Sequence, residues 1–178
     1  MKHPKSIIFF DGDGTLWYPR TTKRRTAPHW IYQDNACKGN YLEHMILIPG
    51  TVSALKKLKA KNIITVLLST HPVGDEAAKA SLLRTATYFK IDKYFDEIHA
   101  TLPMHKSKGI FMERILQERR LHKNRALMIG DNYFYDYQSA RKVGIEGALI
   151  RSSYMYTPIN GRLRNVFSGL KSILDVAI

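Results

Sequence analysis

Residues 7–15 read Ile-Ile-Phe-Phe-Asp-Gly-Asp-Gly-Thr, an apolar run that stops at a carboxylate. The apolar part has the length of a short buried strand. Asp11 and Asp13 follow it, and the glycines between and after them allow the backbone to turn tightly. A strand that ends in this way delivers both carboxylates to the carboxyl edge of a sheet, where open α/β sheets bind ligands. The simpler alternative is an ordinary polar turn, because Asp-Gly is a common turn pair.

The remainder of the chain alternates between apolar runs and amphipathic segments. This alternation predicts parallel βαβ units and a sheet covered on both faces. We therefore expect an α/β fold, a three-layer α/β/α Rossmann-like sandwich with a mainly parallel sheet, as one domain over residues 1–178. Strands are expected at 6–10, 63–68, 95–98, 126–129 and 147–150, and helices at about 51–61, 75–89, 107–120, 133–143 and 163–176.

Residues 16–48 show neither helical nor strand periodicity. The segment contains several breakers and five large aromatic residues, and the aromatic residues argue against disorder. We expect a loop excursion, or a hairpin flap, beside the site that Asp11 begins. Long loops of this kind are usually functional. The basic cluster at 23–25 either faces substrate or is a solvated part of the loop.

Charge and cysteine content limit the class of partner and compartment. The chain carries 28 Lys and Arg against 15 Asp and Glu, a formal net charge of +13, which favours anionic partners or a basic surface without a partner. Cys37 is the single cysteine, and the seven histidines show no paired metal-ligand spacing, so we expect no zinc site. No apolar run has the length of a signal peptide core or a membrane span, and we expect a cytoplasmic protein.

Three predicted strands end in residues suited to metal or phosphate: Asp11, Ser69 and Asp131. The carboxyl ends of parallel strands share one edge of the sheet. Phosphoryl transfer needs a nucleophile, a cation and donors for the spreading negative charge. Asp11 has the chemistry to attack phosphorus, and Asp13 to protonate the leaving group and then activate water. Asp131, with Asp11 and a backbone carbonyl, suits Mg²⁺.

These motifs resemble the haloacid dehalogenase (HAD) superfamily of phosphatases. Residues 11–15 are similar to its first motif, Asp-x-Asp-x-Thr, Ser69 to its second, Lys108 to its third, and Gly130-Asp131 followed by Asp136 to its fourth. Within the superfamily, the chain most resembles the small magnesium-dependent (acid) phosphatases with a minimal cap. Three stretches carry that likeness: Thr15-Leu16-Trp17, the helix start at Pro49-Gly50, and Ser107-Lys108 before Phe111-Met112-Glu113-Arg114.

The resemblance implies a role for each matched residue. Asp11 would be the nucleophile and Asp13 the general acid and base. Mg²⁺ would lie on Asp11, the carbonyl of Asp13, and Asp131. Ser69 and Lys108 would hold the phosphoryl group, although Thr70 and Lys106 stay open as their respective alternatives. Gly12 is a further candidate for phosphate binding, and Thr15, Asn132 and Asp136 are candidates for the shell around the metal.

The resulting hypothesis is a magnesium-dependent phosphomonoesterase that works through an aspartyl-phosphate. Its substrate would be a phosphosugar, another small phosphometabolite or a phosphotyrosine-bearing protein. The +13 charge keeps a nucleic-acid 3′-phosphatase open, which would bind DNA in a salt-sensitive way. A phospho-accepting signalling domain without enzymatic activity is a second alternative, but such a domain has no use for an acid placed as Asp13 is.

Overall fold

The computed structural model describes residues 3–21, 28–70, 75–101, 108–151, 163 and 165–178. Its centre is a six-stranded sheet in the order β5-β4-β1-β6-β7-β8, in which every neighbouring pair is parallel. This arrangement confirms the predicted α/β fold. The strands are β1 Ile7–Phe10, β4 Ile64–Thr70, β5 Glu97–Thr101, β6 Ala126–Gly130, β7 Glu146–Ile150 and β8 Val166–Phe167.

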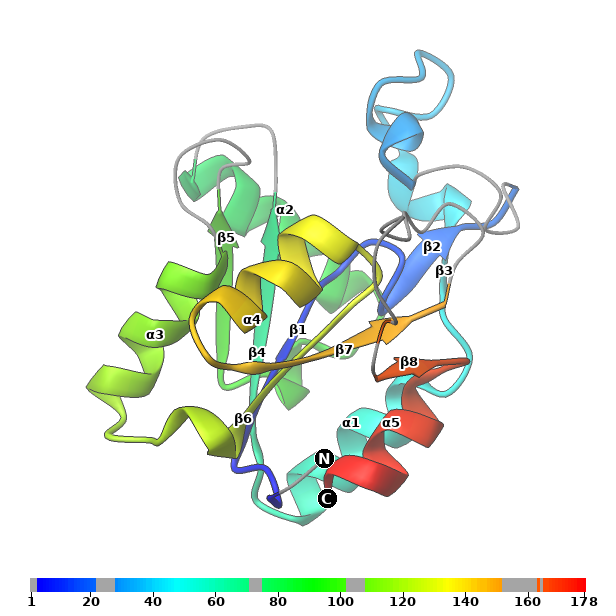
Figure 1. Ribbon diagram of the computed structural model, residues 1–178. Helices are drawn as coiled ribbons and strands as arrows, with labels where there is room; N and C mark the ends of the chain where they lie inside the picture. The colour runs from blue at the N-terminus through cyan, green and yellow to red at the C-terminus, as the bar shows by residue number, and fades with distance from the viewer. Residues whose placement is uncertain (1–2, 22–27, 71–74, 102–107, 152–162, 164) are drawn as a thin grey trace.

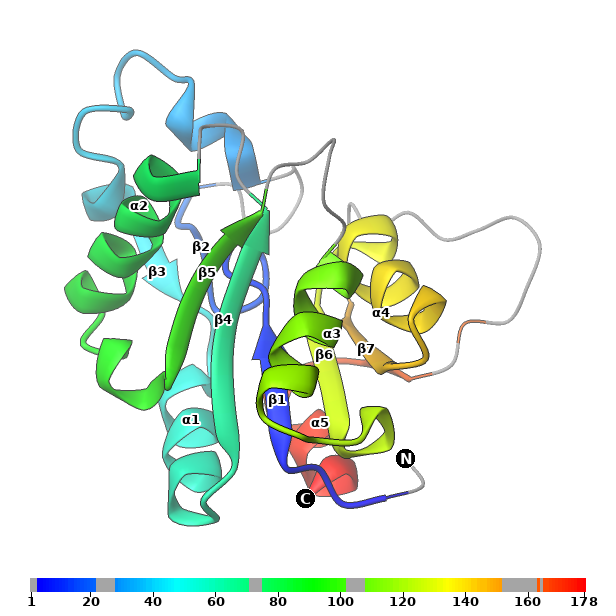
Figure 2. The same ribbon diagram turned by 90° about the vertical axis from the view of Figure 1, so that its left-hand side faces the viewer.

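Helices cover both faces of this sheet (Figure 2). Ile8 and Phe10 of β1 belong to an apolar cluster with α1, α2 and α5, whereas Ile7 and Phe9 belong to a second cluster with α3 and α4. The split follows from the strand period of two, which sends successive side chains to opposite faces. Each such side chain, fully buried, stabilises the fold by roughly 1.5–3 kcal/mol. The helices are α1 Thr51–Ala60, α2 Asp75–Tyr88, α3 Lys108–Glu118, α4 Ser139–Lys142 and α5 Leu170–Ala177.

Strand β1 lies at the middle of the sheet, between β4 and β6. Phe10, its last residue, pairs with Leu67 on one side and Ile129 on the other. The next residue, Asp11, donates its backbone N–H to the carbonyl of Ile129 at 2.9 Å. The register therefore fixes where the chain leaves the sheet, and it brings the ends of β4 and β6 beside Asp11.

The excursion, residues 16–48, lies between the turn that follows β1 and the start of α1 (Figure 1). Its base is an antiparallel pair, β2 Trp17–Pro19 with β3 Met45–Leu47. Two 3₁₀ helices lie between these strands, Pro28–Tyr32 and Tyr41–His44. Tyr41 anchors the excursion to α2, because its hydroxyl lies 3.2 Å from Ser81 Oγ and 3.3 Å from Thr85 Oγ1.

The C-terminal part differs from the sequence-based expectation. A helix was expected over 163–176 with no strand after β7, but Val166 and Phe167 form β8 and pair with Leu149 and Ile150. The β-branched and aromatic pair suits a strand, and the helix α5 begins only after Gly169. The expected strand at 95–98 also lies later, at Glu97–Thr101.

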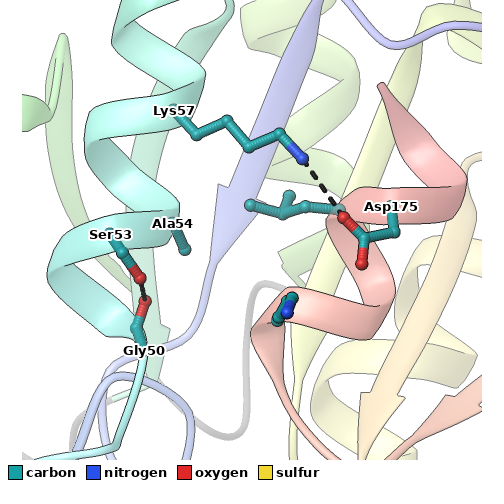
Figure 3. A pocket seen from close by; sticks show the side chains of 7 residues that line it. Gly50, Ser53, Ala54, Lys57 and Asp175 are labelled. Atoms are coloured by element: carbon teal, nitrogen blue, oxygen red, sulfur yellow. Dashed lines mark hydrogen bonds and ion pairs between the residues drawn. The ribbon is translucent and has the colours of Figure 1, made fainter.

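A surface hollow lies between α1 and α5 (Figure 3). An ion pair of 3.2 Å joins Lys57 of α1 to Asp175 of α5 beside it. None of the predicted site residues lines this hollow. They lie at or after the carboxyl ends of the strands, and the candidate site is therefore sought there. The lining residues are Gly50, Ser53, Ala54, Lys57, Lys171, Leu174 and Asp175.

Candidate active site

Asp11 and Ser69 meet at the carboxyl edge of the sheet. Ser69 lies in β4, next to β1, and its hydroxyl donates to Asp11 Oδ1 at 2.9 Å. Both residues are buried. Asp131, which is also buried, follows β6 on the other side of β1. The three predicted strand endings therefore lie together, as the parallel topology requires.

Lys108 enters the same place from the first position of α3. Its ammonium donates to Asp11 Oδ1 at 2.5 Å and to Asp136 Oδ1 at 2.6 Å. Burial alone would lower the pKa of Lys108, but the charges of the two carboxylates outweigh burial and raise that pKa. The side chain is thus a fixed, buried positive charge between two carboxylates.

Three carboxylates crowd around this lysine. One oxygen from each of Asp11, Asp131 and Asp136 lies within 4.8 Å of the others, and all three residues are buried. Burial raises the pKa of Asp136, Lys108 lowers it and the charge of Asp11 raises it, and together these effects bring the pKa to about 6. Three buried carboxylates that each offer an oxygen to one place form an oxygen-only donor set, which fits Mg²⁺.

Asp136 is held at this edge by the backbone after β6. Its Oδ2 accepts the N–H of Asn132 at 2.9 Å. A Cβ on Gly130 would lie 2.1 Å from the same Oδ2, so only glycine leaves room for the carboxylate. Asn132 in turn accepts the N–H groups of Phe134 and Tyr135 at 2.9 and 3.0 Å. These bonds begin a π-helix over Tyr133–Gln138, where sequence analysis expected an ordinary helix.

Asp13 lies apart from the buried cluster and is partly exposed. Trp17 donates its indole N–H to Asp13 Oδ1 at 2.8 Å. The hydroxyl of Tyr32 lies 2.9 Å from Oδ1 and 3.0 Å from Oδ2. Burial raises the pKa of Tyr32 well above its usual value, and the charge of Asp13 raises it further. The phenol therefore stays protonated and acts as a donor to the carboxylate.

The other predicted residues have different surroundings. The hydroxyl of Thr70 lies 3.3 Å from that of Thr101. The carbonyl of Gly12 accepts the N–H of Leu16 at 2.8 Å in the turn after β1. Thr15 is fully buried, and its hydroxyl has no hydrogen-bond partner within the described part of the chain. Lys106, the capping residue Ser107 and the basic cluster at 23–25 lie outside the described residues.

Sequence reasoning missed Trp17 and Tyr32 as donors to Asp13. Trp17 is four residues from Asp13 in the chain, and this short spacing offered a weak signal for it. In the structure, a Cβ on Gly12 would lie 2.6 Å from the Trp17 ring. Nothing in the sequence pointed to Tyr32, because its position depends on how the excursion folds back over the first turn.

The sequence matches the family described as haloacid dehalogenase-like hydrolase over residues 21–150. The chain belongs to this family. The superfamily resemblance inferred from the motifs is thereby confirmed, and the matched stretch contains Ser69, Lys108 and Asp131 but begins after Asp11 and Asp13. A search of curated proteins found no match.

Solved structures share the fold at low sequence identity. A predicted phosphoglycolate phosphatase from Haemophilus somnus superposes with a TM-score of 0.71 at 18% identity, and the match covers 99% of each chain. An uncharacterized protein from Listeria monocytogenes gives 0.70 at 19% identity over 96% of each chain. A haloacid dehalogenase-like hydrolase from Streptococcus pneumoniae gives 0.62 at 19% identity, over 83% of this chain and 85% of that one.

Among the described residues, no helix combines the length and apolarity needed to cross a bilayer.

Proposed function

We propose that this hydrolase is a magnesium-dependent phosphomonoesterase that uses Asp11 as its nucleophile. The observation that carries the proposal is the asymmetry of the Asp11 carboxylate. Ser69 and Lys108 both donate to Oδ1, while Oδ2 accepts no hydrogen bond from the described residues. An oxygen held on one side and left without a donor on the other is suited to attack phosphorus.

The residues around Asp11 supply the remaining chemistry. Attack by Oδ2 forms the aspartyl-phosphate while the bond from phosphorus to the ester oxygen breaks. Lys108 and Ser69 lie where they can donate to the phosphoryl oxygens as negative charge spreads over them. Asp13 gives a proton to the departing oxygen and then takes one from the water that hydrolyses the intermediate.

The donor set supports the metal in this proposal. Asp11, Asp131 and the carbonyl of Asp13 would hold Mg²⁺, with Asp136 behind them. Asp136 contributes one oxygen to the buried group, but hydrogen bonds from Lys108 and the backbone of Asn132 engage both of its oxygens. A bound divalent cation supplies charge neutralisation for the incoming phosphate. The three clustered carboxylates give it an electrostatic reason to bind.

Two structural relatives bear on the substrate class. They are described as a predicted and a putative phosphoglycolate phosphatase, which favours small phosphorylated metabolites as first substrates to assay. A phosphotyrosine-bearing protein stays a candidate. The charge of +13 supports one further candidate, a nucleic-acid 3′-phosphatase. Salt-sensitive binding of 3′-phosphorylated DNA would favour that candidate.

Turnover of p-nitrophenyl phosphate by wild type and Asp11→Asn tests the proposal. We expect wild-type turnover that ends when EDTA removes the metal and returns with added Mg²⁺. Asp11→Asn should be inactive with an unchanged circular dichroism spectrum. Asp175→Asn is the matched control, because this exposed carboxylate pairs with Lys57 beside the hollow between α1 and α5 and is not one of the predicted site residues. Turnover by Asp11→Asn, or full activity in EDTA, would overturn the nucleophile or the metal respectively.

A further inference from the structure

Trp17 and Tyr32 bind the Asp13 carboxylate in a defined geometry. The Tyr32 hydroxyl lies at nearly equal distances from the two carboxylate oxygens, 2.9 and 3.0 Å, so it faces the open end of the carboxylate. Trp17 approaches Oδ1 from a second direction at 2.8 Å. The two donors come from separate parts of the excursion, strand β2 and the 3₁₀ helix Pro28–Tyr32. Together they fix both the position and the plane of the side chain.

Tyr32 is itself supported from behind. Its ring meets that of Tyr41 edge to face, with centroids 5.1 Å apart and an interplanar angle of 64°. Tyr41 is anchored to α2 through Ser81 and Thr85. The Tyr32 hydroxyl is therefore held by an aromatic pair, in which Tyr41 is buried and Tyr32 partly buried, and this pair is tied to the body of the sandwich.

Asp13 needs such support more than Asp11 does. Asp11 is buried and bound by Lys108 and Ser69. Asp13 is partly exposed, so packing restricts its side-chain torsions less. Proton transfer requires the acid within hydrogen-bond reach of the leaving oxygen, about 2.6–3.2 Å. A misplacement of about 1 Å in a reacting group can cost ~100-fold in rate.

We propose that Tyr32 is a positioning residue, whose hydroxyl holds the Asp13 carboxyl in the orientation from which it protonates the leaving group. The proposal rests on the function proposed for Asp13. It makes the excursion part of the proton-transfer apparatus in addition to being a cover for the core. The competing interpretation is that Tyr32 only fills space beneath the excursion.

The two interpretations differ in how activity depends on the leaving group. A p-nitrophenolate ion is stable and departs with little help from an acid. A p-methoxyphenolate ion is more basic and depends more on the proton that Asp13 gives. Loss of orientation at Asp13 therefore slows poor leaving groups selectively, whereas general damage to the fold slows all substrates alike. The value of kcat/KM reports this first chemical step.

The experiment measures kcat/KM for ring-substituted phenyl phosphates, from p-nitrophenyl to p-methoxyphenyl, in wild type, Tyr32→Phe and Tyr88→Phe. Tyr88→Phe is the control, because it removes a tyrosine hydroxyl at an exposed position of α2 that takes no part in holding Asp13. For Tyr32→Phe we expect a loss of ~30-fold with p-methoxyphenyl phosphate and under ~3-fold with p-nitrophenyl phosphate. For Tyr88→Phe we expect the same ratio between substrates as in wild type.

Each other outcome overturns the proposal in a recognisable way. An equal loss on all substrates in Tyr32→Phe, together with a lower melting temperature, would make the residue structural. A selective loss in Tyr88→Phe as large as that in Tyr32→Phe would show that the effect does not depend on the bond to Asp13. If wild type hydrolyses none of these esters, the proposed phosphatase function fails first and the positioning role fails with it. A substrate ratio unchanged in Tyr32→Phe beside an active wild type overturns the positioning role alone.

Discussion

The candidate site has two halves that are built differently. The sheet-edge half consists of the buried groups at the ends of β1, β4 and β6 together with Lys108 of α3 and Asp136. Strand register and short ionic bonds hold it in place. The excursion half consists of Asp13 with Trp17 and Tyr32. Trp17 belongs to the three-residue strand β2, and Tyr32 to the five-residue 3₁₀ helix Pro28–Tyr32. The core thus fixes the clustered charged groups, whereas the excursion holds Asp13, the group proposed to transfer the proton.

This difference has an energetic side. Removing one charge from the sheet-edge half leaves its partners buried and uncompensated, which is strongly destabilising. Asp13 is partly exposed, and Trp17 and Tyr32, which donate to it, are neutral, so loss of either of these donors costs much less. Mutations in the first half should therefore lower stability and activity together. Mutations in the second half should act mainly on proton transfer.

Lys108→Met should show the largest effect. It removes the ammonium between Asp11 and Asp136, so both buried carboxylates lose this positive charge. We expect the free energy of unfolding to fall by about 3–5 kcal/mol and turnover to fall about 100- to 1,000-fold. Urea denaturation and turnover of p-nitrophenyl phosphate measure the two losses. Lys57→Met, at an exposed ion pair, is the control and should change the unfolding free energy by less than ~0.5 kcal/mol.

Gly130→Ala should come next. Its Cβ would lie 2.1 Å from Asp136 Oδ2, so the carboxylate that binds Lys108 must move. We expect a loss of about 1–3 kcal/mol in the free energy of unfolding, with a parallel fall in turnover. In Gly39→Ala, a Cβ would meet nothing within 4 Å, and this control should keep wild-type stability. A stable and fully active Gly130→Ala would contradict the rigid account of the sheet edge.

Gly12→Ala tests the excursion half. Its Cβ would lie 2.6 Å from the Trp17 ring, so the indole must shift from Asp13. We expect a smaller stability loss than in Gly130→Ala, about 1 kcal/mol, with a fall in kcat/KM concentrated on poor leaving groups. Thermal melts and the phenyl phosphate series check both parts. Uniform loss across the series would erase the distinction between the halves.

Thr70→Val should have the smallest effect and separates two neighbouring hydroxyls. Ser69 donates to Asp11, whereas Thr70 lies against Thr101. We expect turnover in Thr70→Val to stay within ~3-fold of wild type, while Ser69→Ala loses roughly 10- to 100-fold, as for a hydrogen bond to a charged group. Kinetics with p-nitrophenyl phosphate decides between them. The reverse order would make Thr70 the phosphate-binding residue.

The same division marks how far the sequence could predict the structure. The sheet and the meeting of Asp11, Ser69 and Asp131 followed from apolar runs and from the rule that parallel strands end on one edge. Strand β8 was missed because a two-residue strand leaves no periodic signal. The contact of Tyr32 with Asp13 could not be predicted, because it depends on a tertiary path through a segment without periodicity.

Residues after β6 lie between these extremes. Asp136 was singled out from its spacing after Asp131, but its bond to Lys108 and the need for Gly130 beneath it became visible only in three dimensions. Local spacing predicts which residues can gather at a strand end. It does not predict which of them bind one another, because those pairings depend on side-chain directions set by packing.

The most direct test of the central claim is to find the phosphate on Asp11. Protein quenched during turnover and treated with borohydride should show homoserine in place of Asp11, because reduction of an acyl phosphate at that carboxyl leaves an alcohol. Peptide mass spectrometry reads this conversion, and Asp11→Asn should show none. Turnover that continues with no modification at Asp11, or with phosphate on a different side chain, would contradict the account.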